Sequence, residues 1–241
     1  MIQKALEYIV GLKEPFIKDI NGETYSDKSL NHIKQYIPMA REVVEMHTLT
    51  SFVDYIKAKI DWMPERMIIQ VESPTRVLLY SALNDNRDRE KLVTVTARVP
   101  GFEFDTFQKR ENFTIGMQAK FMDTEDKALL LKFAGTVESG TITQYSDDGV
   151  SQSAVVKDGI AHKQEALVPS PAVLKPYRTF IEVEQPESSF IFRMKEDKYD
   201  KDICCGLFEA DGGAWMSEAT ERIKAYLMEH LSDMPEFIII A

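Results

Sequence analysis

The chain has 241 residues, of which 44% are hydrophobic and 28% charged, and its 39 acidic and 29 basic side chains give a formal net charge of -10. This composition is typical of a globular protein with a substantial core. No apolar stretch approaches the roughly 18 residues that a membrane span needs, and the first residues lack the apolar core of a secretory signal. We therefore expect a cytoplasmic protein with no membrane association, and the acidic balance disfavours a surface that grips a phosphate backbone as a whole.

Two helices are predicted at the start of the chain. Apolar residues at helical spacing between Ile2 and Leu12 indicate the first. An apolar stripe indicates the second, which should follow Thr48 or Thr50 as its cap and extend to about Asp61. This stripe consists of Leu49, Phe52, Val53, Ile56 and Ile60. Residues 1–64 are therefore expected to form a helical N-terminal region, with a turn at Asn21-Gly22 inside it.

After Pro64 the period of the apolar residues changes to two, which is typical of strands. Short strands are predicted over Met67 to Glu72, Arg76 to Ala82 and Leu92 to Val99. Apolar and polar residues also alternate from Phe113 to Phe121, and this is the clearest strand pattern, although the residue types would permit a helix. A helix with acidic residues near its start is expected to follow, with its apolar positions between Leu129 and Val137.

Residues 139–171 are rich in Gly, Ser, Thr and Asp, and the turn dipeptides Asp148-Gly149 and Asp158-Gly159 predict a protruding hairpin or mobile arm. Three strands should follow, then an amphipathic helix and a short last strand; these are Tyr177 to Gln185, Ser188 to Lys195, Asp202 to Ala210, Met216 to Leu231 and Phe237 to Ile240. The order of elements indicates an α+β fold with mainly antiparallel sheet, flanked by the helical region and the C-terminal helix. We expect one domain over residues 1–241, with the arm inserted.

The cysteines and histidines argue against several kinds of chemistry. The only cysteines are the neighbours Cys204 and Cys205, which point to opposite faces of an extended segment and should be apolar fillers without a disulfide. The histidines lie far apart in the sequence, so no zinc-ligand spacing is present. No serine has the flanking residues of a nucleophile elbow. We expect no cofactor, and a protein without enzymatic activity is favoured over an enzyme.

Carboxylates suggest one catalytic alternative. Glu182 and Glu184 stand two apart on a predicted strand, so they should share a face and can hold a divalent ion together with Asp211 or Asp148. The strings Glu-Asp-Lys at 125–127 and 196–198 each supply part of a metal-dependent nuclease pattern. That pattern is short enough to arise by chance, and both strings fall where surface charge is expected anyway.

Aromatic and basic residues suggest a second alternative. Tyr177, Arg178, Phe180 and Arg193 interleave the two kinds of side chain on adjacent predicted strands, as a platform for single-stranded nucleic acid does. Phe190 and Phe192 would belong to the same platform. The competing interpretation is that the aromatic residues are core and that the arginines pair with carboxylates such as Glu182 and Glu184, and the net charge favours it.

A glycine pair joins the last of the three strands to the C-terminal helix. In the run Glu209-Ala210-Asp211-Gly212-Gly213-Ala214-Trp215, the glycine spacing matches neither the dinucleotide fingerprint nor a P-loop. Exposed backbone N–H groups there can bind an anion. We favour a tight connection in which Asp211 is a turn or cap residue and Trp215 packs underneath.

Two segments carry a family resemblance: Thr48-Leu49-Thr50-Ser51-Phe52-Val53-Asp54-Tyr55-Ile56 and Pro176-Tyr177-Arg178-Thr179-Phe180. They resemble a helix and a Pro-Tyr segment of the YfdQ-like family of phage and prophage proteins, as does the later Ser189-Phe190-Ile191-Phe192-Arg193. The resemblance covers about two thirds of the chain in the order of its elements, and it departs from the family around Leu129 to Val137 and in the arm. It implies a non-virion protein acting in the cytoplasm of the bacterial host, and it supplies no catalytic residues.

The sequence thus favours a phage or prophage protein that acts through protein–protein contacts or self-assembly, as a homo-oligomer or with a host or phage protein partner. The main alternative is a nucleic-acid-binding accessory in phage recombination or replication. A divalent-metal-dependent nuclease is the second alternative.

Overall fold

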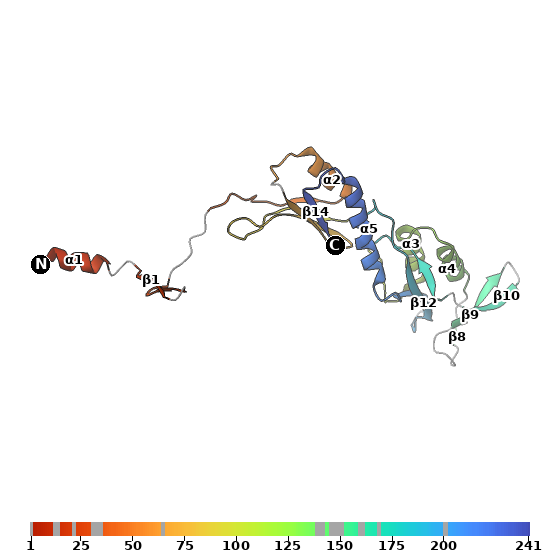
Figure 1. Ribbon diagram of the computed structural model, residues 1–241. Coiled ribbons are helices and arrows are strands. Elements are labelled where there is room, and N and C mark those ends of the chain that lie inside the picture. Colours follow the sequence, from red (N-terminus) through yellow and green to blue (C-terminus); the bar gives the residue numbers. More distant parts are fainter. Residues whose placement is uncertain are drawn as a thin grey trace. The chain divides into compact units, whose positions relative to one another are not determined.

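A computed structural model (Figure 1) describes residues 2–11, 15–20, 23–29, 36–63, 66–137, 143–144, 152–158, 162–167, 170–199 and 202–241. It divides into two compact units, Met1–Met39 with Asp85–Arg87 and Ala40–Asn84 with Asp88–Ala241. Helices and mainly antiparallel sheets confirm the α+β class. None of the helices in the described ranges combines the length and apolarity of a membrane span.

The first unit contains helix α1 (Ile2–Gly11) and a hairpin of β1 (Ile17–Ile20) and β2 (Glu23–Ser26). The N–H of Phe16 donates to the carboxylate of Asp27 at 2.6 Å, which ties the two ends of the hairpin together. The predicted first helix is confirmed. The region expected to be helical, residues 1–64, therefore also contains strands, and the predicted turn at Asn21-Gly22 lies outside the described residues.

A five-stranded sheet forms one half of the second unit, with the order β14-β4-β5-β6-β3. Its strands are β3 (Val44–Met46), β4 (Met67–Ser73), β5 (Arg76–Ser81), β6 (Lys91–Thr96) and β14 (Phe237–Ile240). The pairs β14–β4 and β3–β6 are parallel and the others antiparallel. The predicted strands of this sheet are confirmed, and β3 is an addition that the sequence pattern did not indicate.

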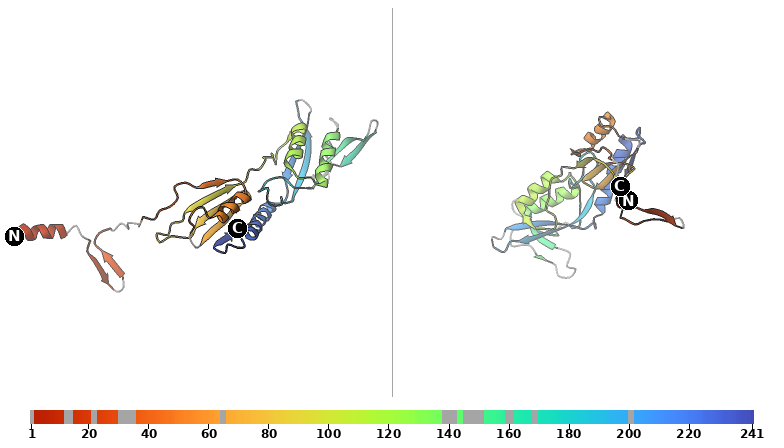
Figure 2. Two further views of the ribbon diagram at one scale, coloured as in Figure 1. Left: turned by 90° about the horizontal axis from the view of Figure 1, so that it is seen from above. Right: turned by 90° about the vertical axis from the view of Figure 1, so that its left-hand side faces the viewer.

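Helices α2 (Leu49–Ala58) and α5 (Ala214–His230) share a hydrophobic core with one face of this sheet (Figure 2). Thr48 caps α2, because its side chain accepts the N–H of Ser51. The helix ends three residues before the expected Asp61: Lys59 has a φ of 49°, and its N–H closes the last turn on Ile56. Ile60, expected in the core, is consequently 74% exposed.

A four-stranded sheet with the order β11-β12-β13-β7 forms the other half of the second unit. Its strands are β7 (Gln108–Lys109), β11 (Ala172–Leu174), β12 (Ser188–Glu196) and β13 (Ile203–Glu209). Helices α3 (Arg110–Lys120) and α4 (Glu125–Thr136) pack on it around a second core that contains Phe113, Phe190 and Phe192. The predictions for α4, β12 and β13 are confirmed.

The strand predicted over Phe113 to Phe121 is wrong, because these residues form most of helix α3. Phe113, Met117 and Phe121 are buried, and they recur every four residues. Ile115, which would face the core in a strand, is exposed. Burial therefore follows the helical period, and contact with β13 and α4 selects the helix over the alternating pattern.

The strand predicted over Tyr177 to Gln185 is also wrong, because this segment is irregular. The side chain of Gln185 provides hydrogen bonds that a neighbouring strand would otherwise make. Its Oε1 accepts the N–H groups of Arg178 at 3.0 Å and Thr179 at 3.2 Å, and its Nε2 donates to the carbonyl of Phe180 at 3.0 Å. A buried glutamine thus holds the segment as a compact loop.

Within the predicted arm at 139–171, strands β8 (Thr143–Gln144), β9 (Gln152–Asp158) and β10 (His162–Leu167) form an antiparallel three-stranded sheet. The hairpin of β9 and β10 confirms that this stretch forms hairpin structure. The residues of the predicted turn at Asp148-Gly149 lie outside the described ranges, as does Gly159. The expectation of one domain over residues 1–241 stays a prediction.

Candidate functional site

Arg178, expected on an exposed face, is buried: its side chain is 9% exposed. Its Nη1 donates to Glu209 at 2.6 Å and its Nη2 donates to the Ser188 hydroxyl. The guanidinium carbon lies 3.9 Å from the centroid of the Trp215 ring. Burial lowers the pKa of Arg178, and the charge of Glu209 opposes that shift. The arginine therefore joins β12, β13 and the first turn of α5 in the interior.

The other members of the expected platform do not form one surface with Arg178. Phe180 is buried in the core of the five-stranded sheet, and Phe190 and Phe192 are buried in the second core. Arg193 donates to the carbonyl of Phe192 at 3.2 Å, and Tyr177 is half-buried. The competing interpretation is confirmed for these phenylalanines, which cannot stack on bases. The partner of Arg178 is Glu209, however, and not Glu182 or Glu184.

The three carboxylates of the expected metal site have separate partners. Glu182 accepts the N–H of Thr50 at 3.2 Å. Glu184 forms an ion pair with Lys175 at 3.2 Å, and the hydrogen bond from Lys175 holds the pKa of Glu184 below its usual range. Asp211 serves the glycine connection described below. Within the part of the chain that the structure describes, no three His, Cys, Asp or Glu residues are grouped as metal ligands.

The glycine connection is the tight turn that the sequence favoured. Asp211 accepts the N–H of Gly213 at 3.0 Å through Oδ1 and the Ser188 hydroxyl at 2.6 Å through Oδ2. Gly212 and Gly213 have φ values of 62° and 81°, which favour glycine. Burial raises the pKa of Asp211, but the hydrogen bonds from Ser188, Gly213 and Trp215, together with the charge of Arg178, lower it more. Asp211 thus accepts a backbone N–H group of its own turn, and Trp215 packs against Arg178.

Burial makes Cys205 a poor nucleophile. Both cysteines are buried in β13, and Cys205 belongs to the second core. Burial raises the pKa of the Cys205 thiol to about 12, so it stays protonated at neutral pH. Cys204 and Cys205 are the apolar fillers that their adjacency indicated.

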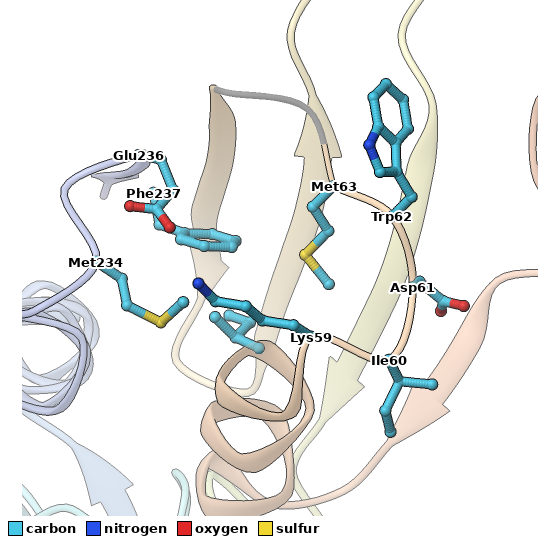
Figure 3. A pocket seen from close by; sticks show the side chains of 9 residues that line it. Lys59, Ile60, Asp61, Trp62, Met63, Met234, Glu236 and Phe237 are labelled. Carbon is cyan, nitrogen blue, oxygen red and sulfur yellow. The ribbon is translucent and has the colours of Figure 1, made fainter.

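A cavity of about 410 Å³ opens where the end of α2 approaches the start of β14. Its lining consists of Ile56, Lys59, Ile60, Asp61, Trp62, Met63, Met234, Glu236 and Phe237. Figure 3 shows Lys59, Met63, Met234 and Phe237 turned toward one another, whereas Trp62 points away from them. Tyr55 donates to Asp61 of the lining at 2.6 Å, and burial, with that hydrogen bond, raises the pKa of the Tyr55 phenol.

The lining of the cavity is suited to binding. Its described residues are mainly apolar, and the charged ones are Lys59, Asp61 and Glu236. The thioethers of Met63 and Met234, together with the ring of Phe237, form an adaptable apolar wall. Trp62 is 86% exposed beside it, and tryptophan is enriched in the energetically dominant parts of protein interfaces.

Sequence reasoning missed this cavity because it placed Ile60 on the buried face of an extended α2. The available signal was the pair Trp62 and Met63 immediately before Pro64. A helix has to stop before a proline, so these two large apolar side chains cannot be buried as part of the helix.

Apolar side chains are exposed throughout the described part of the first unit. In α1, Ile2, Leu6 and Ile9 are exposed, and they lie with Ala5 along one stripe. In the hairpin, Ile17, Ile20 and Tyr25 are exposed. Elements of this size bury too little surface to hold their shape alone.

Comparison with known protein families, curated proteins and solved structures finds no match to this chain.

Proposed function

We propose that this chain acts through protein–protein contacts and self-assembly, without an enzymatic activity of its own. The observation that carries the proposal is the apolar stripe of α1, formed by Ile2, Leu6 and Ile9, which is exposed in the single chain. Contiguous exposed apolar surface of this kind marks interaction sites in proteins that stay in solution.

The length of α1 strengthens this argument. The helix has 10 residues, and isolated helices shorter than roughly 12–15 residues are marginal in water even with favourable sequences. Burial of an apolar face in a partner supplies the missing stabilisation. An amphipathic helix with anchors at i, i+4 and i+7, here Ile2, Leu6 and Ile9, is the pattern that fits a groove of another protein.

The polar face of α1 favours a protein partner over a lipid surface. In sequence, the helix contains one lysine, Lys4, and one glutamate, Glu7, so its formal charges cancel. Helices that lie on anionic membranes depend on several basic residues along the polar face, and α1 has a single one. A second copy of the chain provides the same apolar surface in the same concentration, so self-assembly is the simplest way to cover the stripe.

The phage or prophage setting is part of the proposal, and its support is the resemblance of the segments at 48–56 and 176–180 to the YfdQ-like family. A protein that acts in the bacterial cytoplasm on a phage or host protein fits that setting. The acidic net charge of -10 supports a protein partner over nucleic acid.

The test compares two variants of the same helix in the full chain. Leu6→Ser with Ile9→Ser removes the stripe, whereas Lys4→Ser with Tyr8→Ser changes the opposite face by the same number of substitutions. Light scattering after size-exclusion chromatography gives the mass over a range of concentrations. We expect the wild type and the Lys4/Tyr8 variant to assemble equally and the Leu6/Ile9 variant to fall to a smaller species.

Two outcomes would overturn the proposal. The first is a wild-type protein that stays monomeric at every concentration. The second is an equal loss of assembly in both variants. Together with circular dichroism of both proteins, that result would show that assembly depends on helix content and not on the apolar stripe.

A further inference from the structure

We infer that the free edge of β14 pairs with β14 of a second copy, joining two five-stranded sheets into one continuous sheet about a two-fold axis at Ile239. The inference deepens the proposed self-assembly and rests on it. It adds a second contact between copies, in the other unit of the chain, and the residues of β14 identify a second copy as the partner.

Among the strands of the described ranges, β14 lies at the edge of its sheet and lacks the usual protection of an edge. It consists of Phe237, Ile238, Ile239 and Ile240, without a charge or a proline. Natural edge strands are commonly protected by lysines, prolines or bulges, because an unprotected one pairs with other chains. The opposite edge, β3, carries Glu45 at its centre. The two edges of one sheet therefore differ, and only β14 is free of charge.

The hydrogen bonds of the ladder define which groups of β14 face outward. Met67 donates its N–H to the carbonyl of Glu236 at 3.0 Å, and Met67 is the register partner of Phe237. In a parallel ladder, this bond requires the N–H and C=O of Ile238 to point toward β4 and those of Ile239 to point away from it. Ile239 thus presents one donor and one acceptor at the edge, and in an antiparallel pair it can bond to Ile239 of a second copy in both directions.

The outer face of the sheet adds an apolar contact. Phe237 and Ile239 contribute to the core, so Ile238 and Ile240 lie on the opposite face, where both are about half exposed. Ile238 is in register with Ile68, which is in register with Tyr80. This apolar row ends abruptly at the edge.

Pairing about Ile239 continues that row. Ile238 of one copy stands opposite Ile240 of the other, so apolar side chains meet apolar side chains on both sides of the axis. A strand from an unrelated protein can satisfy the same backbone groups, but a second copy also brings a second half-exposed apolar row and no charge. Self-complementarity of this kind is what a two-fold interface requires.

A first experiment measures the mass of full-length variants. Ile238→Lys places a lysine in the apolar row of each copy, and Ile181→Lys is the matched control, since Ile181 is 79% exposed and lies in the loop after Arg178. To separate the two contacts, each substitution is also made together with Leu6→Ser and Ile9→Ser. We expect the Leu6/Ile9 variant to be a dimer, its combination with Ile238→Lys to be a monomer, and its combination with Ile181→Lys to remain a dimer.

The outcomes distinguish this inference from the proposed function. A Leu6/Ile9 variant that is already monomeric overturns β14 pairing and leaves the role of α1 intact. A Leu6/Ile9 variant with the full wild-type mass overturns the role of α1. In that case β14 pairing is tested by Ile238→Lys alone, which has to lower the mass of the assembly. If Ile181→Lys lowers the mass as much as Ile238→Lys, added charge is the cause and the inference fails.

A second experiment needs no change in assembly. Under the inferred register Ile238 and Ile240 of different copies face each other at a Cα separation of about 4.5 Å, within disulfide range, while equivalent residues are diagonal and about 7–8 Å apart. Ile238→Cys and Ile240→Cys proteins, mixed and oxidised, should therefore form the heterodisulfide well above either homodisulfide. Cys204 and Cys205 are buried and do not compete. Equal yields of the three products, or no product, would contradict the pairing.

Discussion

Arg178 lies over the ring of Trp215, with its guanidinium carbon 3.9 Å from the ring centroid, and the same carbon lies 5.6 Å from the centroid of Phe190. Phe190 belongs to the core of the four-stranded sheet, while Phe180, two residues after Arg178, belongs to the core of the five-stranded sheet. The arginine thus stands where the two cores approach each other, and its hydrogen bonds to Glu209 and Ser188 fix it there.

Arg178→Lys should destabilise the protein by about 3 kcal/mol, because lysine keeps the charge but cannot serve Glu209 and Ser188 at once, and an incompletely paired buried cation is costly. Urea unfolding followed by circular dichroism measures the change. Arg193→Lys is the control, expected within about 0.5 kcal/mol of the wild type, since Arg193 is only partly buried. Equal midpoints for the two variants would refute the role assigned to Arg178.

Substitution by alanine should change the stability of the protein in opposite directions at two glycines. A Cβ at Gly206 in β13 would lie 2.8 Å from the backbone carbonyl oxygen of Thr106, so Gly206→Ala should cost about 1–3 kcal/mol. A Cβ at Gly135 in α4 would meet nothing within 4 Å, so Gly135→Ala should add about 0.5–1 kcal/mol through helix propensity. Thermal unfolding of both variants checks the pair, and changes of the same sign would contradict the packing described for β13.

Cys205 should be unreactive in the native protein. With a pKa of about 12, roughly one thiol in ten thousand is ionised at pH 8, compared with about a quarter for an ordinary cysteine. A raised pKa favours the folded state below the unfolded pKa of about 8.5, and this contribution is lost as the pH rises toward 12. Titration with a thiol reagent measures the reactivity, and Ile181→Cys supplies an exposed control. Labelling of Cys205 at the rate of that control, without urea, would show that β13 is not packed as described.

Asp211→Asn should lower the free energy of unfolding at pH 7 by on the order of 1 kcal/mol, because asparagine retains an oxygen for Gly213 but loses the charge near Arg178. The folded pKa of Asp211 is lowered, so its carboxylate stabilises the protein above the unfolded pKa of about 3.9. That contribution is lost as the pH falls through the folded pKa. The difference between wild type and variant should therefore shrink below about pH 4, as urea unfolding over a range of pH values would show, and Asp54→Asn, at an exposed position of α2, is the matched surface substitution.

The sequence predicted elements well where the apolar period was unambiguous or where a cap was present. Thr48 caps the helix that was expected after it, and Thr124 caps α4, the helix that was expected to begin with acidic residues. It failed over Phe113 to Phe121, where alternate residues are apolar and residues at a spacing of four are also apolar. Contacts with β13 and α4 decide between these two patterns, and such contacts join residues far apart in the chain.

The candidate sites were harder to predict for a related reason. Glu182 and Glu184 share a face only if residues 177–185 are a strand, and the side chain of Gln185 holds them in a loop instead. The cavity beside α2 depends on Lys59 ending the helix early, and a lysine in the left-handed region carries no sequence signal for that conformation. The interpretation of the glycine pair succeeded because Asp211, Gly212 and Gly213 are adjacent and define their turn locally.

The early end of α2 also leaves Trp62 in solvent, where its fluorescence can report on binding. The protein's two tryptophans are Trp62, 86% exposed beside the cavity, and Trp215, packed against the guanidinium of Arg178. Emission from Trp62 should shift to shorter wavelength when a partner covers the cavity, whereas emission from Trp215 should change only when the two cores separate. Trp215→Phe leaves Trp62 as a fluorescent reporter of binding, and Trp62→Phe leaves Trp215 as a reporter of unfolding.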